Sequence, residues 1–202
     1  MLPFSEACER NKEPILDILR NVFAQAVHVL EIGSGTGQHA VWFARHLPHL
    51  QWQPTERTTE LPGLRARIAD EGPPNLRAPL ELDVLVSPWR TPPADAVFSA
   101  NTLHIMGWPG VEAFFAGIAT VLLADGAMLA VYGPFRYRGD YTSASNAAFD
   151  QWLRQRDPVS GIRDFDAVDS LARAAGLTLV ADHDMPANNQ LLVWRRGPAR
   201  PA

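Results

Sequence analysis

The chain has 202 residues, of which 47% are hydrophobic and 20% charged, and its formal net charge is −4. This length suits one domain with a hydrophobic core, and the composition excludes a chain that is disordered throughout. The small negative charge gives no general electrostatic attraction to nucleic acid or to an anionic membrane. Cys8 is the sole cysteine, which excludes an internal disulfide bond and any multi-cysteine metal site.

No apolar stretch approaches the roughly 20 residues of a membrane-spanning helix. The N-terminal segment MLPFSEACERNKEP is too polar for a secretory signal. We therefore expect a cytoplasmic protein without a membrane or nucleic-acid partner.

Apolar side chains recur at helical spacing over residues 5–24, and Pro14 suits the first turn of this helix or the start of a second one. The run 27–32 is continuously apolar, which is typical of a strand buried on both faces. Helices and strands then alternate. Helices are expected at 38–47, 60–71 and 109–123, and strands at 50–56, 78–84, 94–100 and 127–135. Pro54 is expected at the end of its strand, because proline has no N–H for the ladder.

The remaining chain predicts a polar loop at 136–143, helices at 144–156 and 165–175, and strands at 177–185 and 189–196. Alternating strands and helices indicate an α/β fold, a Rossmann-like and mostly parallel sheet with helices on both faces. The two closing strands are joined by too few residues for a parallel crossover, so the last of the seven strands is expected to run antiparallel. We expect a single domain over residues 1–197, with 1–25 as a helical lid and 198–202 as a flexible tail.

The segment EIGSGTG places three glycines at alternate positions between the first strand and its helix. Ligands of open α/β sheets bind beyond the carboxyl ends of the strands, and glycine lets a ligand approach the main chain. The spacing differs from the dinucleotide fingerprint, because Gln38 stands where the third glycine is required, and no P-loop lysine follows. The pattern is acidic-x-Gly-x-Gly-x-Gly, formed by Glu31, Gly33, Gly35 and Gly37. A tight turn without a ligand is the alternative interpretation.

This pattern resembles that of the class I S-adenosylmethionine-dependent methyltransferases. The resemblance implies their seven-stranded fold and the cofactor S-adenosylmethionine, whose sulfonium and ammonium groups suit a nearby carboxylate. A carboxylate about 20 residues past the loop can accept hydrogen bonds from both ribose hydroxyls, and Glu56 lies 23 residues after Gly33. The resemblance also assigns Asp83 and Val84 to the adenine and Asn101 to the methionine part. The remaining cofactor residues that it implies are Glu31, Gly33, Ser34, Gly35 and Gly37.

Longer segments resemble a narrower group, the methyltransferase-like protein 26 family. These are ACERNKEPIL, HVLEIGSGTGQHAVWFA, WQPTE, NTLHI and SNAAFDQWLRQRDPVSGIRDF, and the resemblance extends over residues 5–196. Strand two of that family usually ends in Ser-Asp, where Thr55 and Glu56 stand here. The family has no firmly assigned substrate, so the resemblance implies a cofactor rather than a reaction.

The predicted activity is methyl transfer to a small molecule, because the segment after strand four looks like those of metabolite methyltransferases. On this interpretation His104 lies at the mouth of the reaction pocket and is the candidate base; lining the pocket or capping a helix is its alternative. Tyr137, in a loop with several arginines, is a second catalytic candidate, although the loop also reads as a plain connection. Arg10 and Asn11 are candidates for the methionine carboxylate, or they face water. We expect no metal.

Three rival functions stand beside this one. A nicotinamide oxidoreductase is disfavoured by Glu31 and by the glycine spacing. Enzymes that methylate base amines usually carry [DNS]-P-P-[YFW] after strand four, where this chain has NTLH, and it lacks a basic face; a protein methyltransferase is equally less favoured. A catalytically silent cofactor binder that serves as an interaction module stays open, because the sequence does not define the acceptor pocket.

Overall fold

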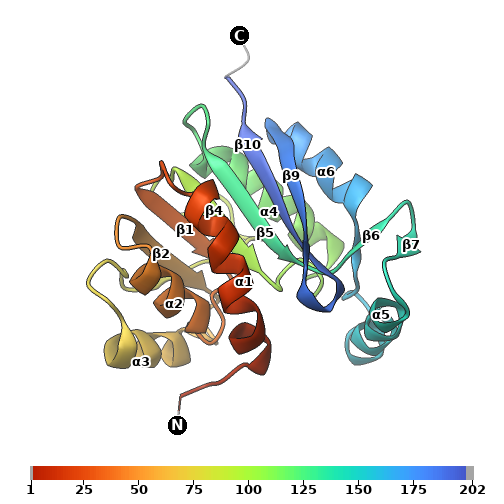
Figure 1. The fold of residues 1–202 in the computed structure, drawn as a ribbon, viewed down its shortest axis with the longest axis horizontal. Coiled ribbons are helices and arrows are strands. Elements are labelled where there is room, and N and C mark those ends of the chain that lie inside the picture. The colour runs from red at the N-terminus through yellow and green to blue at the C-terminus, as the bar shows by residue number, and fades with distance from the viewer. Residues whose placement is uncertain (1, 199–202) are drawn as a thin grey trace.

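The computed structural model describes residues 2–198, and its centre is a seven-stranded sheet (Figure 1). The strands are β1 (His28–Ile32), β2 (Gln51–Glu56), β3 (Leu80–Glu81), β4 (Ala96–Ala100), β5 (Met128–Gly133), β9 (Leu177–Met185) and β10 (Asn189–Arg196). Their order in space is β3-β2-β1-β4-β5-β10-β9. β10 is antiparallel to both of its neighbours, and the other pairings are parallel. The predicted sheet with its reversed last strand is confirmed.

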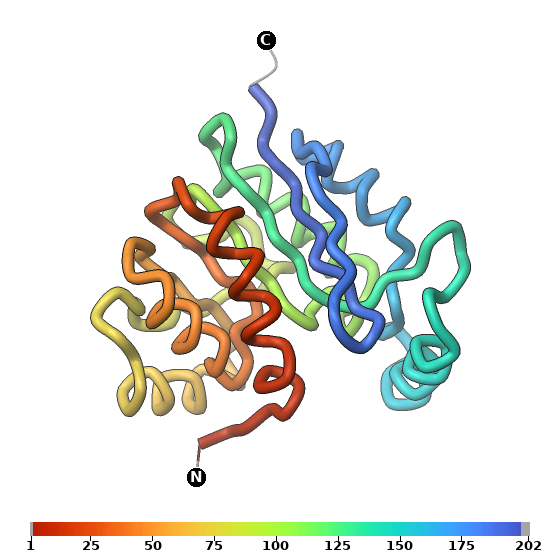
Figure 2. Tube along the Cα trace, in the orientation of Figure 1, coloured from red at the N-terminus to blue at the C-terminus, as the bar shows by residue number. Residues whose placement is uncertain are grey.

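Helices cover both faces of this sheet (Figures 1 and 2). On the front face lie α1 (Glu6–Val22), α2 (Gln38–His46) and α3 (Leu61–Glu71), and behind it lie α4 (Trp108–Val121) and α6 (Phe165–Ala174). Neighbouring residues of β1 serve the two faces in turn: Val29 packs with the α1 and α2 side chains, and Leu30 with those of α4 and α6. This is why the run 27–32 is continuously apolar.

Two prolines lie where the sequence did not place them. Pro14 is inside α1, which continues without a break, so the prediction of a first-turn proline or a second helix was wrong. Burial of Ile15 and Leu19 holds the helix together although the proline ring removes one backbone bond. Pro54 is inside β2 rather than at its end. Trp52 N donates to Asn75 O on the β3 side, so the Pro54 nitrogen faces the same side, before β3 begins, and no ladder bond is lost there.

Two further segments differ from their predictions, one in length and one in type of structure. Strand three is only Leu80–Glu81, much shorter than 78–84, and two residues of β2 pair with it. The loop predicted at 136–143 is instead part of a small second sheet of β6 (Phe135–Tyr137), β7 (Asp140–Tyr141) and β8 (Arg163–Asp164). Its hairpin turns at two residues of positive φ, 54° and 85°, the geometry of a tight two-residue turn.

The small sheet and α5 (Ala144–Arg156) form a unit that we call the cap, residues 135–164. In Figure 1 it lies at the lower right, at the end of the molecule where α1 begins and where β9 turns into β10 through the 3-10 turn Pro186–Asn188. Asn146 of α5 donates to the Asn188 carbonyl over 2.8 Å, which ties the cap to this turn. Residues 199–202 of the predicted tail lie outside the described residues. Within residues 2–198, no helix combines the length and the apolar character needed to cross a bilayer.

Candidate functional site

The candidate site lies at the carboxyl ends of the parallel strands. Because β1, β2, β4 and β5 run in the same direction, the segments that leave them meet at one edge of the sheet. Ser34 N donates to Thr55 O over 3.0 Å, and Asn101 N donates to Tyr132 O over 2.9 Å. The first bond joins the glycine loop to the end of β2, and the second joins the end of β4 to β5. Ser99 Oγ of β4 also donates to Ile32 O at the end of β1 over 2.9 Å.

All three glycines of the loop have positive φ, but they have different surroundings. A Cβ on Gly33 would lie 2.8 Å from Thr102 Cγ2, and one on Gly37 would lie 2.7 Å from Leu64 Cδ1. Among the described residues, a Cβ on Gly35 would meet no atom within 4 Å beyond its chain neighbours. Gly33 and Gly37 thus allow close packing of the protein itself, whereas Gly35 leaves its main chain open to an approaching group.

Glu56 at the end of β2 is joined directly to this open glycine. Its Oε2 accepts a hydrogen bond from Gly35 N over 2.8 Å, and its Oε1 accepts one from Arg57 N over 2.8 Å. The side chain is 9% exposed. Each carboxylate oxygen can still accept another hydrogen bond, so Glu56 can bind a pair of hydroxyl groups beside Gly35.

Glu31 at the end of β1 is a buried carboxyl group, 2% exposed. Its Oε2 accepts hydrogen bonds from Ser34 Oγ and from Trp52 Nε1, both over 2.9 Å. Burial raises the pKa of Glu31 to about 7; the two donors act in the opposite direction, and the charge of Glu56 adds to the rise. Two acidic side chains thus lie beside the loop, which suits a cationic ligand and opposes a phosphate.

The remaining predicted cofactor residues lie around the same edge. Asp83 is half-buried just past β3, and its Oδ1 accepts from Leu85 N over 3.0 Å. Val84 packs against the core beside it. Asn101 has a φ of 56° directly after β4, a conformation that Asn tolerates better than most residues.

Arg10 and Asn11, the predicted contacts of a methionine carboxylate, lie near the start of α1. Arg10 is exposed and pairs with Glu6 over 3.3 Å on the same helix. Asn11 is buried, and its Oδ1 lies 2.6 Å from His39 Nε2 of α2. These contacts join α1 to its own surface and to α2, so the structure does not bring Arg10 and Asn11 to the glycine loop through any bond of theirs.

Sequence reasoning missed three side chains that organise the loop: Trp52, Gln38 and Arg67. Gln38 Nε2 donates to Glu9 Oε1 over 2.6 Å. Arg67 of α3 donates from Nε to Thr36 O over 2.6 Å and from Nη2 to Pro3 O over 2.5 Å. Trp52 stands at an inward position of β2, which strand alternation indicates; the roles of Gln38 and Arg67 depend on contacts between distant segments.

His104 lies just past β4 and next to the cap. Its side chain is 6% exposed, the Phe149 ring packs against it with centroids 5.6 Å apart, and its Nδ1 lies 3.5 Å from the Cβ position of Gly133 at the end of β5. Burial, followed by the positive charge of Arg163, lowers the pKa of His104 to about 4. The imidazole is therefore neutral near pH 7, with a lone pair available to accept a proton or a hydrogen bond.

Tyr137, the second catalytic candidate, contacts α6 and β9. Its ring stacks on Phe165 of α6, with centroids 5.2 Å apart, and its hydroxyl donates to Asp182 Oδ2 of β9 over 2.6 Å. Burial and the contact with Asp182 raise the pKa of the hydroxyl. This geometry favours a role in joining the cap to β9.

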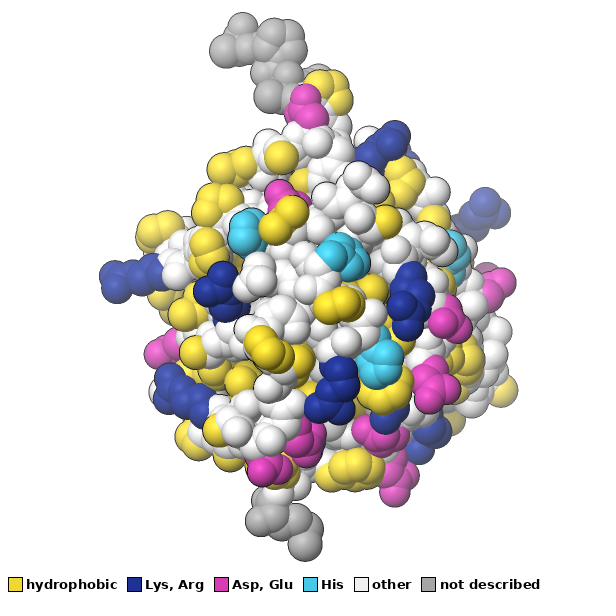
Figure 3. Space-filling model, turned by 60° about the vertical axis from the view of Figure 1, so that its left-hand side comes forward, with side chains coloured by type: hydrophobic (Ala, Val, Ile, Leu, Met, Phe, Trp, Pro, Cys, Tyr) yellow, Lys and Arg dark blue, Asp and Glu magenta, His cyan; other side chains and the backbone are white. Residues whose placement is uncertain are grey.

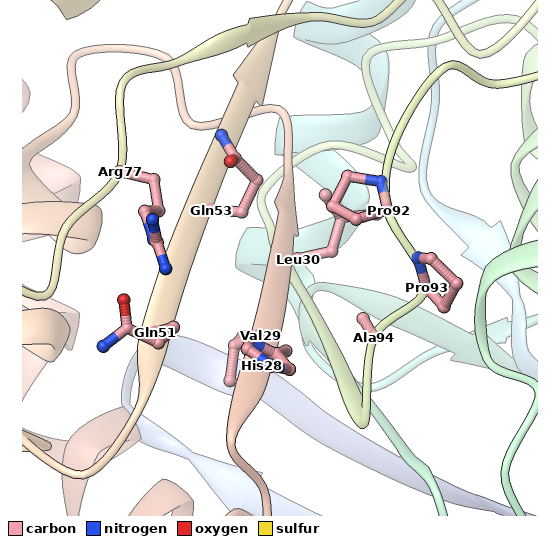
Figure 4. A pocket seen from close by; sticks show the side chains of 9 residues that line it. All are labelled: His28, Val29, Leu30, Gln51, Gln53, Arg77, Pro92, Pro93 and Ala94. Atoms are coloured by element: carbon pink, nitrogen blue, oxygen red, sulfur yellow. The ribbon is translucent and has the colours of Figure 1, made fainter.

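Two cavities lie elsewhere on the molecule. One of about 310 Å³ opens at the amino ends of β1 and β2, opposite the glycine loop (Figure 4). Its lining includes His28, Gln51, Arg77 and Pro92. Another of about 620 Å³ lies between α1, α2 and α3. On the face drawn in Figure 3, basic and acidic side chains are interspersed, so this face offers no continuous basic surface to nucleic acid.

Comparison with known proteins places this geometry in a family. A family model described as "Protein of unknown function (DUF938)" matches residues 2–196. The chain belongs to the DUF938 family. This match covers nearly all of the described residues, including the glycine loop, both glutamates, His104 and the cap.

Solved structures share the fold of the DUF938 chain. An O-methyltransferase family protein from Burkholderia thailandensis is 20% identical, with a TM-score of 0.82 over 96% of this chain and 59% of that chain. The S-adenosylmethionine-dependent methyltransferase SibL is 22% identical, with a TM-score of 0.77 over 94% of this chain and 55% of that chain. Mitomycin 7-O-methyltransferase MmcR is 20% identical, with a TM-score of 0.72 over 87% of this chain and 50% of that chain. At these identities the likeness shows the class I methyltransferase fold alone, and the DUF938 chain spans between 50% and 59% of the length of these solved chains.

Proposed function

We propose that this DUF938 protein is an S-adenosylmethionine-dependent methyltransferase with a small-molecule acceptor. The observation that carries the proposal is the bond between Glu56 and Gly35 N, which unites an acidic strand end with an open glycine inside a methyltransferase fold. A nicotinamide dinucleotide would bring its pyrophosphate beside two carboxyl groups, an unfavourable encounter. The resemblance to the methyltransferase-like protein 26 family and a cytoplasmic site of action belong to the proposal and rest on the sequence alone.

The residues present fit the cofactor. Glu56 would accept hydrogen bonds from the ribose hydroxyls, and Asp83 with Val84 would border the adenine. Glu31, whose side chain bonds Ser34 and Trp52 and no cation within residues 2–198, would provide negative charge toward the sulfonium and ammonium groups. When bound, S-adenosylmethionine supplies an electrophilic methyl group. The protein's own contribution is to exclude water and to align the acceptor with that group.

His104 is the proposed base of the reaction. Its ring is neutral near pH 7, and among residues 2–198 no hydrogen bond holds either ring nitrogen, so a nitrogen is free to accept a proton from a hydroxyl or amine. A conjugate acid with a pKa near 4 makes His104 a weak base, which suits an acceptor whose proton is already acidic. Arg10 and Asn11 remain the proposed contacts of the methionine carboxylate. Tyr137 is a weaker candidate than His104, because its hydroxyl already donates to Asp182.

The acceptor is proposed to be a small molecule. The names of the structurally similar proteins support this class, since one of them is a mitomycin 7-O-methyltransferase. The interspersed charges of Figure 3 and the net charge of −4 oppose a nucleic-acid acceptor.

Calorimetry with S-adenosylhomocysteine and, separately, with NADH tests the proposal. We expect S-adenosylhomocysteine to bind and NADH to give no heat; the reverse result, or no heat with either, contradicts the proposed cofactor. Incubation of metabolite extracts with methyl-labelled cofactor should then transfer label to a small product that mass spectrometry identifies. Binding without transfer to any extract component would favour the silent interaction module.

A further inference from the structure

The turn that carries His104 is held by one short segment of the cap. Four successive carbonyl groups, those of residues 103–106, each accept a hydrogen bond from residues 160–163. Arg163 Nε donates to Leu103 O over 2.9 Å, Gly161 N to His104 O over 2.8 Å, and Ser160 Oγ to Ile105 O over 3.0 Å; Arg163 Nη2 donates to Met106 O. We call this set of bonds the carbonyl clamp.

Arg163 provides the two ends of the clamp. Besides the bonds to Leu103 and Met106, its Nη2 donates to Val159 O over 2.9 Å, so one guanidinium joins three carbonyl groups. A planar fork can reach acceptors at separate positions at once, whereas a lysine ammonium is a single point on a flexible stem. The residue type therefore matters to the clamp beyond its charge.

The clamp is connected to the rest of the cap through Asp150 of α5, which is 2% exposed. Asp150 Oδ1 accepts from Ile162 N over 2.5 Å, and its Oδ2 accepts from Tyr141 Oη over 2.7 Å and from Arg154 Nε over 2.8 Å. A buried carboxylate with three donors is a rigid anchor, because losing any donor leaves a buried charge less satisfied. Any displacement of α5 or of the small sheet therefore reaches residues 160–163.

His104 consequently touches the cap with both its main chain and its ring. The clamp holds the carbonyl groups on either side of it, and Phe149 of α5 packs against the imidazole. We propose that Arg163 is a positioning residue, whose fork to the 103–106 turn sets the orientation of the His104 ring and couples it to the cap. The inference rests on the proposed function in one respect, namely that His104 is the base that benefits from this alignment.

The test uses the imidazole signals of the full chain in nuclear magnetic resonance, with His104 assigned from the signal lost in His104→Gln. In wild-type protein the His104 signal should titrate near pH 4, as its burial implies. Arg163→Lys keeps the positive charge but not the fork. We expect it to shift the His104 signal and to raise its midpoint by about one pH unit, because a loosened turn exposes the ring to water. Arg163→Met should raise it at least as much.

Arg156→Met is the matched control, since Arg156 is also a cap arginine but its guanidinium lies over the Trp152 ring, 5.5 Å from the centroid. This variant should leave the His104 signal unchanged. A wild-type His104 signal and midpoint in Arg163→Lys would overturn the positioning role. If Arg163→Met does not fold, Asp150→Asn takes its place, and it should move the same signal by weakening the anchor.

Calorimetry with S-adenosylhomocysteine on the same samples distinguishes a failure of the proposed function from a failure of the carbonyl clamp. The Arg163 variants should bind it within about twofold of wild type, because the clamp does not contact the glycine loop. A wild-type protein that binds none of it contradicts the proposed function, whereas an unmoved His104 signal contradicts the clamp. A large loss of this affinity in Arg163→Lys together with general unfolding would likewise contradict a role limited to His104.

Discussion

Gly35 differs from the two other glycines of its loop in what a side chain would meet. Gly33 and Gly37 face protein atoms, so replacing either would disturb packing, whereas the space beside Gly35 is open. An open position with left-handed backbone and a neighbouring carboxylate is what a ligand-binding main chain requires. A substitution of Gly35 should therefore affect ligand binding without disturbing the packing of side chains.

Gly35→Ala is expected to weaken binding of S-adenosylhomocysteine at least about tenfold, because the methyl group would occupy the approach to the main chain. The left-handed φ of 53° should lower the free energy of unfolding by about 1 kcal/mol. Calorimetry and urea denaturation measure the two effects.

Gly126→Ala is the matched control for this change. Gly126 also has positive φ, 83°, and no atom of the described residues lies within 4 Å of its Cβ position, but it precedes β5 at the other end of the strands. It should lose a similar stability and keep wild-type affinity. Equal affinities in the two variants would mean that the loop does not bind the cofactor.

Among the helices, α3 connects the N-terminal segment to the glycine loop through Arg67. This side chain is 5% exposed and donates to carbonyls of both Thr36 and Pro3, while Glu71 balances its charge over 2.9 Å. The segment before α1 is thereby held against the loop. The predicted lid at residues 1–25 stays a prediction. If this segment acts as a lid, Arg67 is a side chain that joins it to the glycine loop.

Arg67→Met should lower the free energy of unfolding by about 3 kcal/mol, since the bonds from a charged donor to the Thr36 and Pro3 carbonyls are lost. It should also weaken binding of S-adenosylhomocysteine by about tenfold, because the 33–37 loop loses the bond to Thr36 O. Thermal unfolding and calorimetry report the two quantities. Arg65→Met, on the exposed side of the same helix, should change neither. Wild-type affinity in Arg67→Met would show that the loop keeps its geometry without α3.

The short strands of the cap are defined by their pairing rather than by a pattern in the sequence. β7 and β8 have two residues each, too few for a periodic pattern, and they are strands because they pair with β6. β7 pairs with β6 across a two-residue turn, whereas β8 depends on the pairing of residues 136 and 164, far apart in the chain. A strand such as β8 follows from the tertiary structure rather than from local propensity.

For the molecule as a whole, two buried histidines contribute to the loss of stability in acid. Burial lowers the pKa values of both His39 and His104 to about 4 from the ordinary 6.5. The unfolded chain takes up protons near pH 6.5 and the folded chain does not, so the stabilisation is present above that pH and is lost as the pH falls toward 4. Glu31 has the opposite sign, because its raised pKa favours the folded state at lower pH.

Urea denaturation at pH 7 and at pH 5 measures this contribution. Replacing one of the two buried histidines by Gln should reduce the loss of stability over this interval by about 2 kcal/mol. His28→Gln, at an exposed position, should leave the loss as in wild type. An identical pH dependence in wild type, His39→Gln and His104→Gln would show that these rings are protonated in the folded state as readily as in the unfolded chain.

Much of the fold could be predicted because local patterns report it directly. Continuous apolar runs mark strands that are covered on both faces, and the short closing connection excludes a parallel last pair. The errors at Pro14 and Pro54 have different causes. Burial of the apolar face of α1 offsets the backbone bond that is lost at Pro14, whereas the Pro54 nitrogen faces a side where no ladder bond is lost.

The candidate site likewise has features that the sequence predicts and features that it does not. By itself, the sequence determined that Glu31, Gly35, Glu56 and the segment of His104 gather at one edge, because each lies at or just past the carboxyl end of a strand and parallel strands end together. Only the tertiary structure decided that Trp52 donates to Glu31, that Arg67 holds the loop and that the cap clamps the turn of His104. Position along a strand is encoded locally, whereas a hydrogen bond between distant segments exists only after packing has brought its donor and acceptor within reach.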